Sequence, residues 1–217
     1  MIQFGEKVEG FSIPVLNERE IRASAGLLFL ATFTSLFLIL FKNNFVPIKY
    51  VVTLFFTDFI IRVFINPKYS PTLILGRLIV GKQTPEYVGA KQKLFAWKIG
   101  LLLSGIMFVF LVLVNAYSPI TGLGCLICLI FLFFESAFGI CLGCKFYSLF
   151  YKEKAEYCPG EVCKREARQD IQKTSAVQFL IILAFMGYLT ATIIFFSREF
   201  SKKPYDLFGI SSRSKSK

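Results

Sequence analysis

Residues 120–140 read ITGLGCLICLIFLFFESAFGI, a stretch in which Glu135 is the one charged side chain. A helix needs about 20 mostly apolar residues to cross the hydrocarbon core of a bilayer, so this stretch predicts a membrane-spanning helix. Other apolar stretches of similar length lie at about 23–41, 46–65, 97–117 and 177–196. The predicted fold class is therefore an all-α integral membrane protein with about five transmembrane helices.

The composition agrees with a membrane protein. Hydrophobic residues make up 55% of the 217 residues and charged residues 18%, whereas soluble domains average about 45–50% apolar and about 25% charged. The 25 Lys and Arg exceed the 14 Asp and Glu, but they flank the apolar stretches, which argues against nucleic-acid binding. The absence of histidine excludes His-based catalytic triads, His-ligated haem and His-containing zinc sites.

A short helix is predicted between the second and third spans. Ser70-Pro71 is a helix-start signal, because the serine hydroxyl caps free N–H groups and proline suits the first turn. Residues 70–81 are too few to cross a bilayer. With Arg77 and Lys82 at the margin, apolar side chains recur at helical spacing: Leu73, Ile74, Leu78 and Ile79. This pattern predicts an interfacial amphipathic helix lying on the membrane.

The Lys and Arg of the connecting segments predict the orientation. They gather between the second and third spans and in the segment 151–175, whereas the connection between the third and fourth spans has none. Cytoplasmic loops carry the excess of Lys and Arg, so both basic segments and the N-terminus are predicted to be cytoplasmic, in a cell inner membrane. Five spans then place the tail outside, against the charges of Arg198, Lys202 and Lys203. The two loops agree with each other and outweigh this conflict.

The predicted organisation follows from these boundaries. Asn17 is the expected N-cap of the first helix, with Glu18 and Glu20 in its first turn. The tail is rich in Ser and Lys and is expected to be disordered. The parts are a cytoplasmic N-terminal segment (1–22), a four-helix membrane domain (23–150), a basic cysteine-containing loop (151–175), a fifth transmembrane helix (176–197) and the tail (198–217).

Three stretches resemble a known family. They are NEREIR at 17–22, residues 59–62 followed by Tyr69-Ser70-Pro71, and above all ESAFGICLGCKFY at 135–147. Together they resemble the bacterial membrane family called domain of unknown function 4395, over residues 15–150. The resemblance implies a four-helix membrane domain without an established activity. It also implies an association with thioredoxin-like and sulfurtransferase proteins, and hence thiol or sulfane-sulfur chemistry.

Cys141 and Cys144 are the candidate thiol pair. Their spacing places both on one face of a helical turn, within reach of a disulfide. Lys145 would favour a thiolate, and Gly139 and Gly143 allow close approach of a partner or a break in the helix. The alternative is that the cysteines serve as small apolar residues in helix packing.

The other cysteines allow further interpretations. Cys158 and Cys163 lie in the polar loop and, with Cys141 and Cys144, give the spacing C-x2-C-x13-C-x4-C. This approaches a four-cysteine zinc site, which a reducing cytoplasm would favour over a lasting disulfide. Zinc is thus a possible cofactor. The remaining pair lies among apolar residues and is assigned to packing: Cys125 and Cys128.

A charged Glu135 side chain in contact with lipid would cost free energy, so it is expected to face the bundle interior. It is a candidate catalytic proton acceptor or a partner for Arg62. An equally simple interpretation is a protonated carboxyl bonded to a neighbouring helix. Asp58 and Arg62 are four residues apart and are expected to form a structural ion pair.

Three functions remain open. The first is a thiol-redox or sulfur-relay protein in which the Cys141–Cys144 pair works with a thioredoxin-like or sulfurtransferase partner. The second is a transporter subunit that uses Glu135, Arg62 and Asp58 as a polar path. The third is a non-catalytic membrane scaffold with a zinc-bound loop. The sequence contains no motif for a quinone, flavin or nucleotide site.

Overall fold

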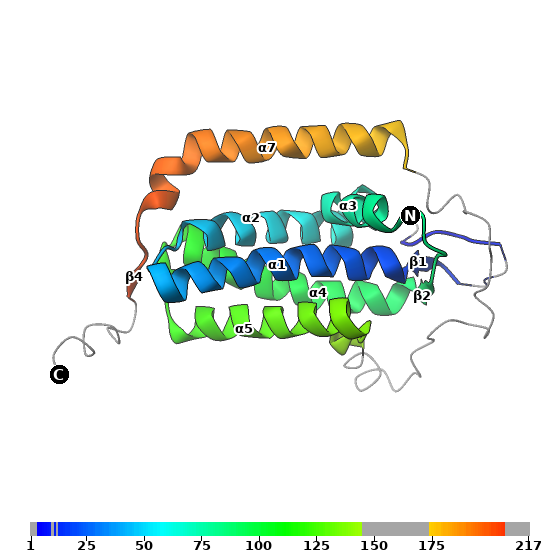
Figure 1. Cartoon of the computed structure of the whole chain (residues 1–217), viewed down its shortest axis with the longest axis horizontal. Helices are drawn as coiled ribbons and strands as arrows, with labels where there is room; N and C mark the ends of the chain where they lie inside the picture. Colours follow the sequence, from blue (N-terminus) through cyan, green and yellow to red (C-terminus); the bar gives the residue numbers. More distant parts are fainter. Residues whose placement is uncertain (1–3, 10, 12, 145–173, 207–217) are drawn as a thin grey trace.

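The computed structural model describes residues 4–9, 11, 13–144 and 174–206. Four long helices form a bundle, and a further long helix lies along one side of it (Figure 1). The bundle helices are α1 (Glu18–Lys42), α2 (Val46–Ile60), α4 (Ala90–Phe108) and α5 (Pro119–Phe133). The outer helix is α7 (Ala176–Ser201), which packs against α2 and the short helix α3 (Pro71–Val80). Turns of π-helix at Ile61–Ile65, Val109–Leu113 and Phe134–Phe138 extend α2, α4 and α5.

The helices begin at polar caps that satisfy their first N–H groups. The side chain of Asn17 accepts a hydrogen bond from the N–H of Arg19 at the start of α1, and Ser70 accepts one from Leu73 at the start of α3. Both caps confirm the sequence predictions. Ser118 and Ser175 form capping boxes with the residues three positions later.

Four helices in the described part of the chain are long and apolar enough to cross a membrane: Glu18–Lys42, Ala90–Leu113, Pro119–Phe138 and Ala176–Ser201. The remaining predicted span, 46–65, is helical throughout, as α2 and its π-turn. It differs because it carries three charged residues, which are all buried inside the bundle: Lys49, Asp58 and Arg62.

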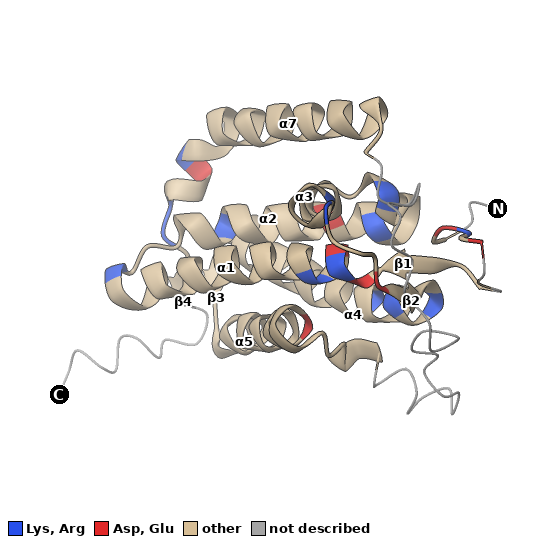
Figure 2. Cartoon of the chain, turned by 45° about the vertical axis from the view of Figure 1, so that its right-hand side comes forward, with Lys and Arg blue, Asp and Glu red and all other residues tan. Residues whose placement is uncertain are grey.

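Pairs of short strands join segments at opposite ends of the bundle (Figure 1). At one end β1 (Val15–Asn17) pairs antiparallel with β2 (Tyr87–Gly89). At the other end β3 (Ala116–Tyr117) pairs in parallel with β4 (Tyr205–Asp206). Figure 2 shows that charged residues gather mainly at the β1–β2 end.

The predicted disorder of the tail was wrong for residues 198–206. Helix α7 continues to Ser201, and β4 follows it. The buried ammonium of Lys49 donates to the carbonyl oxygens of Phe200 and Lys202, at 3.2 and 2.6 Å. These bonds to backbone groups, which composition does not reveal, hold the segment against the bundle. Residues 207–217 lie outside the described residues.

Helix α3 packs on the first turns of α1. Gly76 lies at the contact, where an added Cβ would stand 2.5 Å from the carbonyl oxygen of Glu20. Arg77 was predicted at the margin of an apolar face but is buried, because it pairs with Glu20. The exposed side of α3 is itself apolar, with Leu78 and Ile79 51% and 61% exposed. That side is free to contact lipid, while the position of α3 on a membrane surface stays a prediction.

The core and the outer surface of the bundle are both apolar. The interior contains Phe55, Phe59 and Trp97 near the β1–β2 end, and Ile48 and Met107 toward the other end. Outside, large apolar side chains remain uncovered, most of all on α7: Leu180, Ile194 and Phe195 are 64%, 67% and 77% exposed. A surface of this kind suits contact with lipid rather than water.

Candidate functional site

Cys141 and Cys144 form a disulfide just beyond the end of the extended α5 helix. Their Cα atoms are 5.2 Å apart, and the N–H of Cys144 donates to Sγ of Cys141 at 3.1 Å. Both residues are buried, at 5% and 1% exposure. The predicted disulfide reach is therefore confirmed, at the β1–β2 end of the bundle.

Two glycines determine the position of the Cys141–Cys144 disulfide. Gly139 ends the helix in the left-handed region, with φ +65°, and a Cβ there would also meet the guanidinium of Arg22 at 3.2–3.3 Å. Gly143 lies against α4, where an added Cβ would stand 2.7 Å from Cβ of Ala96. The first glycine lets the chain turn after α5, and the second lets residues 141–144 close onto α4.

A cavity of about 70 Å³ lies between α1, α2, α4 and α5 beside the disulfide. Cys141, Leu142 and Gly143 form part of its wall. Most of the remaining wall is aliphatic or aromatic, and the charged residues on it are Arg62, Lys93 and Glu135. The arrangement brings Cys141 of the disulfide, a carboxylate and two cations around one cavity.

Glu135 lies inside the bundle, as predicted, but its ion-pair partner is Lys93. The ammonium of Lys93 is 2.5 Å from Oε1 of Glu135 and 2.8 Å from Oε2 of Glu18. The Lys93 side chain is 2% exposed and both carboxylates are 14% exposed. Arg62, the predicted partner, lines the same cavity but forms its ion pair with Asp58.

Sequence reasoning missed Lys93 as a site residue because the predicted third span began at Trp97. With that boundary Lys93 belongs to the connection between the second and third spans, whereas in the structure α4 already begins at Ala90. A usable signal was present: Lys93, Trp97 and Gly100 are spaced by four and three residues and so share one helix face. All three line the cavity.

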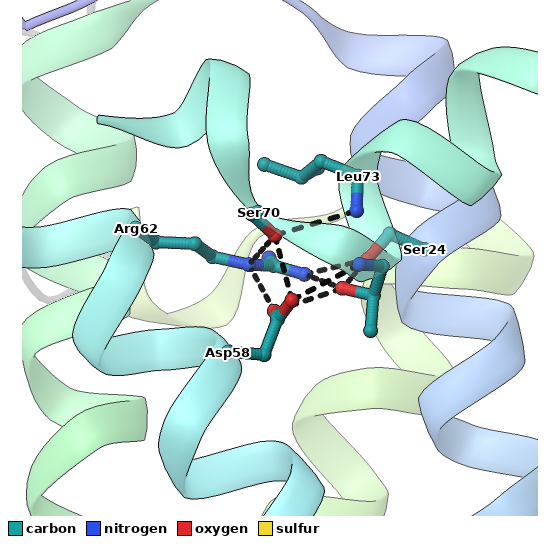
Figure 3. Close-up of polar contacts among 6 residues, drawn as sticks. Ser24, Asp58, Arg62, Ser70 and Leu73 are labelled. Carbon is teal, nitrogen blue, oxygen red and sulfur yellow. Dashed lines mark hydrogen bonds and ion pairs between the residues drawn. The ribbon is translucent and has the colours of Figure 1, made fainter. Parts of the chain in front are cut away.

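Asp58 and Arg62 form the predicted ion pair, with Nε 2.7 Å from Oδ2. Around it lies a buried network that joins three helices (Figure 3). Ser70 donates to Oδ1 of Asp58 at 2.8 Å and the N–H of Thr72 donates to the same oxygen at 3.0 Å. The Arg62 guanidinium donates from Nη2 to Ser24 on α1 at 2.6 Å. With so many fixed partners the pair ties α1, α2 and α3 together.

A further charge cluster lies beneath the N-terminal segment. Arg77 is 3.1 Å from a carboxylate oxygen of Glu20 and 3.6 Å from one of Glu6. Asn17 donates to the other oxygen of Glu20 at 3.0 Å. Burial raises the pKa of Glu6 above its ordinary value, and the positive charge of Arg77 only partly opposes this rise. The cluster joins α3 and the N-terminal segment to the first turn of α1.

The remaining cysteines divide into two groups. Cys125 is buried and Cys128 half-buried, both as free thiols, and Cys128 lines the cavity together with Cys141. Cys158 and Cys163 lie outside the described residues, as does Lys145. Within the described ranges no group of three or more Cys, Asp or Glu is arranged to hold a metal ion. The four-cysteine zinc site thus stays a prediction.

Most of the chain is similar to a known family of domains. The model of a family described as a domain of unknown function (DUF4395) matches residues 16–152. This range covers α1 to α5 and the disulfide, and it agrees with the resemblance over residues 15–150. No curated protein and no solved structure matches the chain. With more than half of its length matched, the chain belongs to the DUF4395 family of domains of unknown function.

Proposed function

We propose that the chain is a membrane thiol-redox protein in which the Cys141–Cys144 disulfide exchanges with the thiols of a protein partner. The observation that carries this proposal is the disulfide on the wall of a cavity that also holds Glu135 and Lys93. A purely structural cross-link would need neither the cavity nor the charged groups. The partner class suggested by the family resemblance is a thioredoxin-like or sulfurtransferase protein.

The exchange proceeds in two steps. One thiolate of a partner dithiol attacks a sulfur of the disulfide, forming a mixed disulfide while the other cysteine leaves as a thiolate. The second partner thiolate then attacks the mixed disulfide, so the partner becomes oxidised and Cys141 and Cys144 become a dithiol. Two electrons pass to the chain, and the two protons of the partner thiols end on the two cysteines. Glu135 is the proposed proton carrier.

The membrane arrangement supports a catalytic role for this disulfide. We propose that α2 and its π-turn are the fifth span, and that the β1–β2 end faces the cytoplasm of a cell inner membrane. In that compartment lasting structural disulfides are rare, and those that form are mostly transient and catalytic. Both cysteines are buried, so a protein partner gains access when residues 140–144 open from the end of the bundle.

The other candidate functions have less support. A transport path through Asp58 and Arg62 would require their bonds to Ser24, Ser70 and Thr72 to break. A sulfur relay, with a persulfide on one cysteine, would use the same site and differ in the atom transferred. The zinc scaffold would need the disulfide to be reduced first, because thiolates are the zinc ligands.

The experiment compares two variants of the whole chain that each keep one CxxC pair. One retains only Cys141 and Cys144, and the matched control retains only Cys125 and Cys128, with all other cysteines replaced by Ser. Each purified protein is equilibrated in redox buffers, quenched, denatured and treated with a maleimide that adds mass to every free thiol.

We expect Cys141 and Cys144 to lose their labels together in one two-electron transition, while the control pair stays labelled in every buffer. A single Cys141→Ser change should leave Cys144 labelled throughout. If Cys141 and Cys144 remain fully labelled under oxidising buffers, the proposed function is wrong.

A further inference from the structure

We propose that the cavity beside the disulfide binds a lipophilic para-quinone, which oxidises the Cys141–Cys144 dithiol back to the disulfide. This inference rests on the proposed thiol-redox function and adds its electron acceptor.

The disulfide is buried but borders the cavity. Cys141 and Cys144 are only 5% and 1% exposed, yet Cys141 forms part of the cavity wall. In this state a molecule inside the cavity reaches Cys141, whereas a second protein does not. A redox cycle needs both a donor and an acceptor, and the cavity provides a separate place for a small acceptor.

The wall of the cavity suits an aromatic, lipid-soluble molecule. Phe59, Trp97 and Phe131 lie on it, and the Arg62 guanidinium stacks over the Phe59 and Trp97 rings, 4.7 and 5.2 Å from their centroids. At about 70 Å³ the space holds a few waters, since a water needs roughly 10–15 Å³, and a ring that enters it displaces them. Four apolar helices line it, so its wall suits a ligand that is dissolved in the bilayer.

The charged groups suit the proton chemistry of a quinone. Lys93 faces two carboxylates, those of Glu18 and Glu135, so one negative charge of this cluster is left uncompensated. Asp58 already compensates Arg62. The cluster can therefore accept a thiol proton and return it to a quinone oxygen, with Lys93 as hydrogen-bond donor to that oxygen.

The proposed step balances in atoms and electrons. The Cys141 thiolate adds to a ring carbon of the quinone, and the quinone oxygen takes a proton from the Glu18–Lys93–Glu135 cluster. The Cys144 thiolate then attacks Sγ of Cys141, the S–S bond forms, and the S–C bond breaks with its electron pair going to the quinol. A second proton completes the quinol. Two electrons and two protons leave the dithiol and reach the quinone.

No sequence motif marks this site, because its walls come from four separate helices. Two neighbouring leucines of α4 provide a matched pair of variants. Leu103 lines the cavity, whereas Leu102 is 65% exposed on the outer surface. Leu103→Phe reduces the space and Leu102→Phe adds the same group outside. Both variants keep Trp97 as the single tryptophan of the chain, whose fluorescence a quinone bound in the cavity should quench.

The experiment uses the full chain in phosphatidylcholine nanodiscs, reduced and freed of reductant. Decylubiquinone and a short-chain menaquinone serve as separate arms. Both quinone rings are fully substituted, so a thiolate adds to them only reversibly and leaves no stable alkylated product. Quinol absorbance and thiol labelling measure turnover, and Trp97 quenching measures binding. Oxidised glutathione provides a quinone-independent oxidant.

We expect one quinol formed per disulfide and quenching of Trp97 in the unmodified chain and in Leu102→Phe. Leu103→Phe should require about tenfold more quinone for both signals and keep its oxidation by glutathione disulfide. The arm with the lower half-saturating concentration identifies the ring class. Equal behaviour of the two variants, or no quinol with intact thiol exchange, would overturn the inference alone. Loss of all thiol exchange would instead contradict the proposed function.

Discussion

At the scale of single residues, three buried cations each meet a carboxylate from another element or another turn. Arg62 meets Asp58, Lys93 meets Glu18 and Glu135, and Arg77 meets Glu20. A buried charge without a partner is costly, and membrane-embedded charges therefore pair and face the bundle interior. The pairing explains how a chain that is 55% hydrophobic keeps these groups among its helices.

Removing the Lys93 charge should destabilise the fold strongly. In Lys93→Met the carboxylates of Glu18 and Glu135 face each other without a cation, at an expected cost of about 3–5 kcal/mol. Thermal unfolding of the detergent-solubilised protein measures the effect.

The control for this prediction is Lys91→Met, two residues earlier on α4. Lys91 is exposed, so its loss should change stability by less than about 0.5 kcal/mol. Equal effects of the two substitutions would mean that the buried ion pairs contribute nothing specific to stability.

At the scale of elements, glycines set the closest contacts. Gly76 brings α3 onto the backbone of α1, and Gly143 brings the disulfide turn onto Ala96 of α4. Helices of a membrane bundle gain packing where small residues let backbones approach. Because α3 also supplies Ser70 and Thr72 to the Asp58–Arg62 network, its position fixes the orientation of Arg62 at the cavity.

A side chain at residue 76 should displace α3. In Gly76→Val the new Cβ would stand 2.5 Å from the carbonyl oxygen of Glu20, and a backbone atom cannot move aside as a flexible side chain can. We expect a loss of about 1–3 kcal/mol in stability and faster hydrogen exchange in Pro71–Val80. Leu75→Val, on the exposed side of α3, is the control. Unchanged exchange in both variants would show that α3 does not depend on this contact.

At the scale of the whole molecule, the two strand pairs lie at opposite ends of the bundle (Figure 1). The start of α7 is held at the β1–β2 end, where Gln178 donates to the carbonyl oxygen of Lys68 at 2.9 Å. The segment that follows α7 is held at the opposite end of the bundle, where Tyr205 of β4 donates its N–H to the carbonyl oxygen of Asn115 at 3.0 Å. Helix α7 thus covers the full length of the bundle, from one strand pair to the other.

This arrangement predicts opposite exposure for two introduced thiols. In a chain whose own cysteines are replaced by Ser, Ser201→Cys should react with a membrane-impermeant maleimide added to intact cells. Lys82→Cys, in the connection between α3 and β2, should react only after the membrane is opened. Both positions are exposed in the structure. The same response from both sites would contradict an odd number of spans.

Local signals in the sequence were enough for much of the fold and for part of the site. The apolar stretches predicted the helices, including all of 46–65, because the length of an apolar stretch is a local property. Asn17 and Ser70 marked helix starts, because a cap acts on the next few N–H groups. The i, i+3 spacing predicted the reach of Cys141 and Cys144, and the i, i+4 spacing predicted the Asp58–Arg62 pair.

The tertiary structure decided which distant groups meet. Glu135 pairs with Lys93 because α5 and α4 are rotated so that these side chains face each other, and rotation depends on how Gly143, Ala96 and their neighbours pack. Residues 200–202 are held against the bundle because Lys49 reaches backbone oxygens about 150 residues away along the chain. The cavity exists only where four helices surround it. Sequence spacing describes neighbours within one element, whereas contacts between elements depend on the packing of the whole bundle.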